Sequence, residues 1–254
     1  MISPLHATGV GAHPHAALTG TYLDGAHLDE SVANLRPDYR ALLIVATGVR
    51  GGPSDATSDA ALTRAETLAR ARLNGAPPES LPEIAAWRDA FLGFAVKPRQ
   101  ARSSLEALLR RVDAGLPRID RLTDLYNAIS IEHLIPLGGE NLDRYVGPPR
   151  LVRADGDETF ETVADGIPTT VTVDPGEVVW RDDLGVTCRR WNWRQCVRTR
   201  LDPSTTNVLF ILDGLDPVGT DRLEAAGAAL VDALTRHAPD AAATTRLIGA
   251  GSPR

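Results

Sequence analysis

The stretch from Cys188 to Arg200 concentrates side chains that bind anions and aromatic groups, since it holds five arginines, two tryptophans and no acidic residue. If it forms a strand, alternation places Trp191, Trp193 and Val197 on one face and Arg190, Asn192, Arg194, Arg198 and Arg200 on the other. Forked guanidinium donors suit phosphates and carboxylates, and tryptophan can stack on a base. The alternative is equally physical, because paired tryptophans usually lie in a core and surface arginines often form solvated ion pairs.

A second candidate for chemistry is Asn127, a polar residue between apolar turns of a helix predicted from Asp120 to Leu134. Its amide would point toward a pocket beside the turn at Gly138-Gly139, since polar groups near such turns often define small-molecule sites. The alternative is that Asn127 only bonds neighbouring backbone. His133 is better explained as a surface or last-turn histidine than as a base.

Two acidic residues complete the set of candidate site residues. Asp213 follows the apolar strand NVLFIL, and a carboxylate at a strand end commonly faces a cleft, although a turn explains Asp213-Gly214 as well. Glu177 precedes the apolar run Val178–Trp180 and points either inward or, by default, to solvent at an exposed edge.

Familiar catalytic signatures do not occur: there is no G-x-S-x-G, H-E-x-x-H, Walker A or G-x-G-x-x-G motif. The G-x-G at Gly9 and Gly11 has no strand before it, and His13 and His15 alone are too few to bind a metal. The two cysteines, seven residues apart around the arginine-rich stretch, suit neither a disulfide scaffold nor a zinc site, so we expect reduced thiols. We therefore expect neither a metal nor an organic cofactor.

Along the chain, most of the helices predicted to position these residues come before most of the predicted strands. A buried strand is predicted within Tyr39–Val49, followed by helices opening at Ser58, near Pro82 and at Ser103, where Ser103 and Glu106 match a capping box. The apolar stripes expected to pack inward are Leu62, Ala65, Leu68 and Leu73; Ile84, Trp87, Phe91 and Phe94; and Leu105, Leu108, Leu109 and Val112.

Residues 151–211 consist of short β-rich runs between turns, and a helix capped by Thr220 closes the pattern near His237. This order favours an α+β fold over a regularly alternating one. We expect a single domain over residues 21–237, with a flexible extension at 1–20 and a flexible tail at 238–254.

The composition indicates the class of protein and the partners and location to be expected. The 254 residues are 43% hydrophobic and 24% charged, which is typical of globular proteins, and the net charge of −6 requires a local basic patch for any nucleic-acid binding. The longest apolar run, Ala41 to Ala46, is far too short to span a bilayer, and the first residues show no secretion signal. We expect a cytoplasmic protein without membrane contact.

Three segments in fixed order resemble the B3/B4 module of the phenylalanyl-tRNA synthetase β subunit, in its free-standing form: PRIDRLTDLYNAISIEHLIPLGGENLD, DPGEVVWRDDLGVTCRRWNWRQCVRT and TTNVLFILDGL. The resemblance is strongest from Ser103 to Leu215. It implies a mixed or antiparallel sheet flanked by helices, tRNA or aminoacyl-tRNA as partner, and an amino-acid moiety as ligand. It also implies hydrolysis in trans of a mischarged aminoacyl ester. The other possibility is a non-catalytic module that binds a free amino acid, a small metabolite or a protein.

Carried over residue by residue, the resemblance implies that Asn127 takes the place of a polar pocket asparagine and that 189–194 takes the place of a glycine-rich pocket wall. Gly138 stands where the synthetase motif has a histidine, and Ile211 where it has a specificity glutamate. The residues implied as catalytic are Asn127 and Asp213. The residues implied as substrate-binding are Glu177, Arg189, Arg190, Trp191, Asn192 and Arg194.

Overall fold

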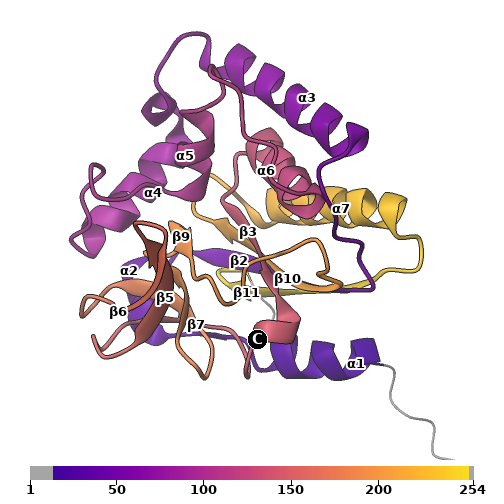
Figure 1. Cartoon of the computed structure of the whole chain (residues 1–254). Coiled ribbons are helices and arrows are strands. Elements are labelled where there is room, and N and C mark those ends of the chain that lie inside the picture. The colour runs from indigo at the N-terminus through magenta and orange to yellow at the C-terminus, as the bar shows by residue number, and fades with distance from the viewer. Residues whose placement is uncertain (1–13, 252–254) are drawn as a thin grey trace, which may run out of the picture.

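The computed structural model of the chain describes residues 14–251 (Figure 1). Within this range the α-helices, in chain order, are α1 (Pro14–Thr19), α2 (Glu30–Leu35), α3 (Ala56–Leu73), α4 (Pro82–Gly93), α5 (Ser104–Leu109), α6 (Arg121–His133) and α7 (Thr220–His237). A π-helical turn spans Gly20–Asp24, and 3-10 turns span Pro78–Ser80 and Leu142–Arg144. None of these helices is long and apolar enough to cross a membrane.

The strands form two main sheets and a hairpin. The four-stranded central sheet has the order β11 (Ala242–Gly249), β2 (Arg40–Thr47), β10 (Asn207–Gly214) and β3 (Leu137–Asn141), with every pair antiparallel. The five-stranded sheet has the order β1 (His27–Leu28), β4 (Arg150–Arg153), β7 (Val178–Arg181), β8 (Val186–Arg189) and β9 (Arg194–Gln195). Strands β5 (Thr159–Ala164) and β6 (Ile167–Thr172) pair only with each other. The α+β class predicted from the sequence is confirmed.

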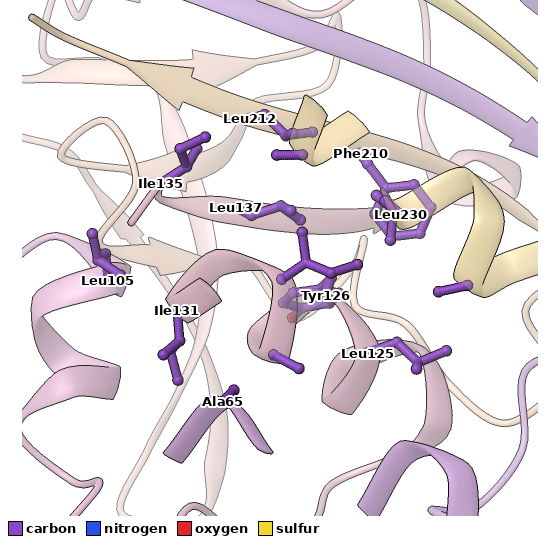
Figure 2. Packing of buried hydrophobic residues seen from close by; sticks show 14 of the residues in the cluster. Ala65, Leu105, Leu125, Tyr126, Ile131, Ile135, Leu137, Phe210, Leu212 and Leu230 are labelled. Atoms are coloured by element: carbon purple, nitrogen blue, oxygen red, sulfur yellow. The ribbon is translucent and has the colours of Figure 1, made fainter. Parts of the chain in front are cut away.

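The inner strands β2 and β10 are apolar on both faces because protein covers both. On one face, Ile44, Phe210 and Leu212 pack against helices α3, α6 and α7, where Tyr126 of α6 and Leu230 of α7 meet the sheet (Figure 2). The opposite face packs against the five-stranded sheet and the aromatic residues of α4. One sheet therefore joins both apolar clusters into a single body.

The aromatic cluster on the second face centres on Trp191, which is fully buried. Its ring centroid lies 5.0 Å from that of Tyr39 and 5.4 Å from that of Trp87, both in edge-to-face geometry that favours aromatic pairs. Phe91 and Phe94 extend the same cluster. The predicted α4 stripe is thus core, and it anchors the loop that carries Trp191.

Polar caps determine where the helices begin. Asp120 accepts a hydrogen bond from the Thr123 amide at the start of α6, and Ser103 accepts one from the Glu106 amide at the start of α5. The prediction that Ser58 caps α3 was wrong by three residues. Asp55 is the N-cap, and Ser58 is the reciprocal member of its capping box.

The inward stripes also need correction at three positions. Leu68 is 40% exposed, and Leu73 and Leu108 are only partly buried, whereas Leu105, Leu109 and Val112 are buried. Leu68 lies off the face of α3 that buries Leu62, Ala65 and Ala69.

Both predicted flexible ends are partly ordered. Residues 242–249, placed in a flexible tail by the sequence analysis, form strand β11, paired with β2 along its whole length. This edge strand begins with two alanines and two threonines and has apolar residues only at Leu247 and Ile248, so it lacks the continuous apolar signature that the prediction required. At the other end, residues 14–19 form α1, and the His15 ring bonds the hydroxyls of Thr47 and Thr244 at 2.8 and 2.9 Å. Gly9, Gly11 and His13 lie outside the described residues.

Candidate functional site

A cavity of about 260 Å³ opens beside edge strand β3, between α5, α6 and the β8–β9 hairpin. Asn127 reaches it from α6, Asn192 and Arg194 from the hairpin, and Asp213 from the end of β10. The structure thus brings together residues 86 positions apart in the chain. Cavities of this kind, with apolar walls and a few convergent polar groups, are the usual form of small-molecule sites.

The arginine-rich stretch is a tight hairpin and not the continuous strand predicted from its alternation. Pairing of Cys188 with Gln195 and of Arg189 with Arg194 leaves a four-residue loop. Within this loop Arg190 and Trp191 have φ values of 46° and 66°, a left-handed conformation that breaks the period of two. The Trp191 amide donates to the carbonyl of Val178 at 2.7 Å, which fixes the loop against β7. As a result Trp191 enters the core, and both Trp191 and Asn192 line the cavity.

Glu177 is buried, contrary to the expectation that an exposed edge is its default environment. Its carboxylate accepts two hydrogen bonds from the Arg189 guanidinium, at 2.8 and 2.6 Å, and one from the Arg190 amide at 3.1 Å. A bidentate pair of this kind is among the strongest charged hydrogen-bond arrangements. Glu177, Arg189 and Arg190 do not line the cavity. They instead hold the base of the hairpin whose loop and second strand do line it.

The floor of the cavity follows from strand register. Gly138 lies opposite Ile211, and Glu140 lies opposite Leu209, so these residues share one face of the central sheet with Asp213. Glu140, Gly138, Ile211 and Asp213 all line the cavity. A carboxyl group therefore stands toward each end of the floor, and the missing side chain of Gly138 leaves space between them.

Asp213 is 3% exposed and has two donors. The Tyr39 hydroxyl donates to Oδ1 at 2.6 Å, and the Asn192 amide donates to Oδ2 at 3.3 Å. Burial raises the pKa of Asp213 to about 7, although the bonds from Tyr39 and Asn192 act in the opposite direction. A carboxyl group with a pKa near 7 is suited to accept a proton at neutral pH.

Glu140 is the least expected residue of the site. It is 1% exposed, and its Oε2 atom has no hydrogen-bond partner among residues 14–251. Burial raises the pKa of Glu140 to about 8, while the hydroxyls of Thr199 and Thr187 lower it in part. Glu140 was not among the residues predicted from the sequence. The available signal was an acid two residues after Gly138, whose absent side chain leaves room on the same face of the strand.

The mouth of the cavity is cationic. Arg111, just beyond α5, and Arg194 of β9 are both exposed, and neither forms an ion pair with a carboxylate in the part of the chain that the structure describes. The guanidinium of Arg194 stacks on Trp193, with 4.5 Å from its central carbon to the ring centroid, and Arg190 lies equally close to the same ring. A shallow depression beside the mouth adds Arg102 to this surface.

The side-chain amide of Asn127 lines the cavity and forms no hydrogen bond among residues 14–251. The alternative in which Asn127 only bonds neighbouring backbone therefore does not hold. His133 is the last residue of α6 and lies outside the cavity. Partial burial lowers its pKa, as expected for a histidine at a packed helix end.

Cys188 and Cys196 are buried free thiols, and burial raises the pKa of both, which makes them poor nucleophiles. Within residues 14–251 no three His, Cys, Asp or Glu side chains cluster as a metal site requires. The groups available in the cavity are two carboxyl groups with pKa values near neutrality, three side-chain amides and the arginines of the mouth.

Comparisons with known proteins match this chain to one domain family. The family model described as the B3/4 domain matches residues 86–236, which is more than half of the chain. Among solved structures, an N-terminal fragment of the phenylalanyl-tRNA synthetase β-subunit from Pyrococcus horikoshii is similar over 86% of this chain, at 14% identity and a TM-score of 0.45. This chain covers 49% of that fragment, or about half of its length. No curated protein matches. The residues matched by the family model include every lining element of the cavity, and the chain belongs to the B3/4 domain family.

Proposed function

We propose that this protein binds the acceptor end of a tRNA and hydrolyses, in trans, the ester of a wrongly attached amino acid. The observation that carries the proposal is the joint placement of Asn127, Asn192 and Asp213 in one cavity whose mouth bears the unpaired arginines Arg111 and Arg194. The resemblance of three sequence segments to the editing module of phenylalanyl-tRNA synthetase supports the same activity.

The charge distribution suits such a substrate. The chain carries a net charge of −6, so a polyanion would be repelled from most of its surface and attracted only to a local basic area. Arg111 and Arg194 provide that area at the mouth, where the last phosphates of an acceptor strand would lie. The aminoacyl group would then enter the cavity, with its ester near Asn127.

The reaction needs a positioned water and a donor for the developing oxyanion, because an aminoacyl ester is already reactive. Asp213 in its ionised form accepts a proton from water as the water oxygen attacks the ester carbonyl. The amide of Asn127 donates to the tetrahedral oxyanion. The carbon–oxygen bond to the ribose then breaks, the ribose oxygen takes up the proton, and free amino acid and tRNA leave.

The other residues suggested by the sequence have indirect roles in this proposal. Trp191 anchors the hairpin in the aromatic cluster, and the pair of Glu177 with Arg189 fixes its base. Asn192 both bonds Asp213 and lines the cavity. Arg194 is the member of the stretch that is free to meet the substrate.

The test is deacylation of a panel of mischarged tRNAs by the purified protein and by Asp213→Asn, Asn127→Ala and a control, Asp240→Asn. Asp240 is exposed and remote from the cavity lining. We expect the two cavity variants to lose at least about a hundredfold in rate, as for removal of a single oxyanion donor or base, with the control unchanged. Equal rates for all four proteins would refute the assignment. Ligand binding without hydrolysis of any member would indicate the non-catalytic module.

A further inference from the structure

Oε2 of Glu140 is a buried acceptor without a hydrogen-bond partner among residues 14–251, in a cavity lining that also holds the unpartnered Nε1 donors of Trp180 and Trp191. Polar atoms in protein interiors are almost always hydrogen-bonded, and an unpaired buried carboxyl is costly. Oε2 of Glu140 has no partner among the described residues, and Glu140 lines the cavity. This oxygen is therefore available to accept a hydrogen bond from a group that enters the cavity.

The register between β3 and β10 places the carboxyl group of Glu140 relative to Asp213, the proposed base. Asp213 lies two residues beyond Ile211 on β10, and Glu140 lies two residues beyond Gly138 on β3, in the opposite direction along the sheet. Gly138 and Ile211 occupy the space between the two carboxyl groups. Near Asp213, Oδ1 of Asn192 is a second buried acceptor without a partner among residues 14–251. The two ends of the floor therefore both present acceptors, separated by an apolar middle.

We propose, resting on the function proposed above, that the cavity takes an amino acid whose side chain ends in an amine, with its α-ammonium near Asp213 and Asn192 and its terminal ammonium at Glu140. The apolar middle of the floor matches the methylene groups of such a side chain. No cation of the cavity lining is available inside to pair with Glu140, because Arg111 and Arg194 are exposed at the mouth.

The charge of the partner follows from the electrostatics of the site. Burial raises the pKa of Glu140 to about 8, so the empty cavity favours the protonated acid at neutral pH. An ammonium group reverses this preference: Glu140 releases its proton to solvent and forms a charge-assisted bond. Such bonds are roughly twice as strong as neutral ones. A neutral hydroxyl would gain only an ordinary hydrogen bond.

The experiment measures binding of free L-lysine and L-ornithine against L-norleucine and L-norvaline, which match their chains but lack the amine, with L-tyrosine as a hydroxyl probe. Calorimetric titration and thermal shift serve as readouts. We expect both diamino acids to bind at least about tenfold more tightly than their apolar counterparts. Glu140→Gln should abolish that difference, whereas Glu224→Gln, at an exposed position of α7, should retain it.

Equal affinity for lysine and norleucine, or preference for tyrosine alone, would overturn the inference. So would unchanged lysine binding by Glu140→Gln. The comparison of ligands on the unmodified protein remains decisive even if that variant fails to fold. Failure of the proposed hydrolysis is distinguishable: lysine binding with no deacylation refutes the catalytic proposal alone, and deacylation with no preference for amines refutes only this inference.

Discussion

The hydroxyl of Tyr39 donates a 2.6 Å hydrogen bond to Oδ1 of Asp213, linking the residue just before β2 to the carboxyl group near the end of β10. Both residues are almost fully buried, and Ala41 of β2 pairs with Asp213 in register. This bond lowers the pKa of Asp213 against the larger effect of burial. Tyr39 therefore tunes the proton affinity of the proposed base without lining the cavity.

The first prediction concerns the pH dependence of hydrolysis. With Asp213 as base, kcat/KM should rise with pH through about 7, the pKa of Asp213, and level off above it. Tyr39→Phe removes a bond that favours the ionised form, so the rising limb should move to higher pH. The variant should also lose about 1–3 kcal/mol of stability, because Oδ1 is left without its donor. A pH–rate profile of both proteins checks this, and a limb at the same pH in both would contradict it.

The second prediction concerns Glu140 and stability. Because its pKa is raised in the folded protein, the folded state retains a proton that the unfolded chain releases above about pH 4.3. The contribution of Glu140 to stability is thus fully present below that pH and lost as pH rises to about 8. Glu140→Gln should therefore be increasingly more stable than the unmodified protein between pH 5 and 8.

Urea unfolding at several pH values measures this difference, with Glu224→Gln as the exposed control. If the difference in unfolding free energy between Glu140→Gln and the unmodified protein is constant across this pH range, folding does not raise the pKa of Glu140. The experiment needs no substrate, so it tests the electrostatics of the cavity separately from its function.

The third prediction separates structural from substrate-binding arginines. Arg189→Ala removes the bidentate partner of the buried Glu177 carboxylate, which then keeps only its contacts with Arg190, and should cost up to about 3–5 kcal/mol. Arg194→Ala should stay within about 1 kcal/mol, since Arg194 is exposed and unpaired, yet weaken tRNA binding and reduce its salt dependence by about one phosphate contact. Arg190 is mostly buried near Glu177, so its loss should fall between the two. Chemical unfolding measures the loss of stability, and RNA titration at two salt concentrations measures tRNA binding. A larger loss of stability for Arg194→Ala than for Arg189→Ala would contradict the assignment.

The sequence predicted elements whose local signals agree with their environment. The Ser103 cap of α5, the stripe of α4 and the apolar strands β2 and β10 were recognisable because the elements bury continuous apolar surfaces. Strand β11 was not, since an edge strand that begins with small and polar residues resembles a loop in composition.

The site was less predictable than the fold. Asn127, Asn192 and Asp213 were identified as candidates, with their roles still to be tested. The alternation across the arginine-rich stretch suggested a strand, but the left-handed residues Arg190 and Trp191 depend on the aromatic cluster that holds them. Glu140 was missed because its burial depends on the packing of the five-stranded sheet over β3, which no local pattern encodes.

The last prediction uses the two adjacent glycines of β3, which face opposite sides of the sheet. A Cβ at Gly138 would point into the cavity and meet only the flexible end of Gln195, at 3.1 Å. A Cβ at Gly139 would lie 2.9 Å from the buried ring of Phe210. Gly138→Ala and Gly138→Leu should therefore fold, with the leucine filling the floor between Glu140 and Asp213 and abolishing ligand binding.

Gly139→Ala is the matched control for these variants. It should lose about 1–3 kcal/mol through overpacking against Phe210 while the remaining folded protein binds ligand as before. Thermal unfolding with and without ligand separates the two effects. Gly138→Leu should lose the ligand-induced shift in Tm, whereas Gly139→Ala should have a lower Tm without ligand but keep the shift. If Gly138→Leu keeps its ligand shift, the ligand does not lie on this floor, since a leucine side chain and a bound aminoacyl group cannot share the space beside Ile211.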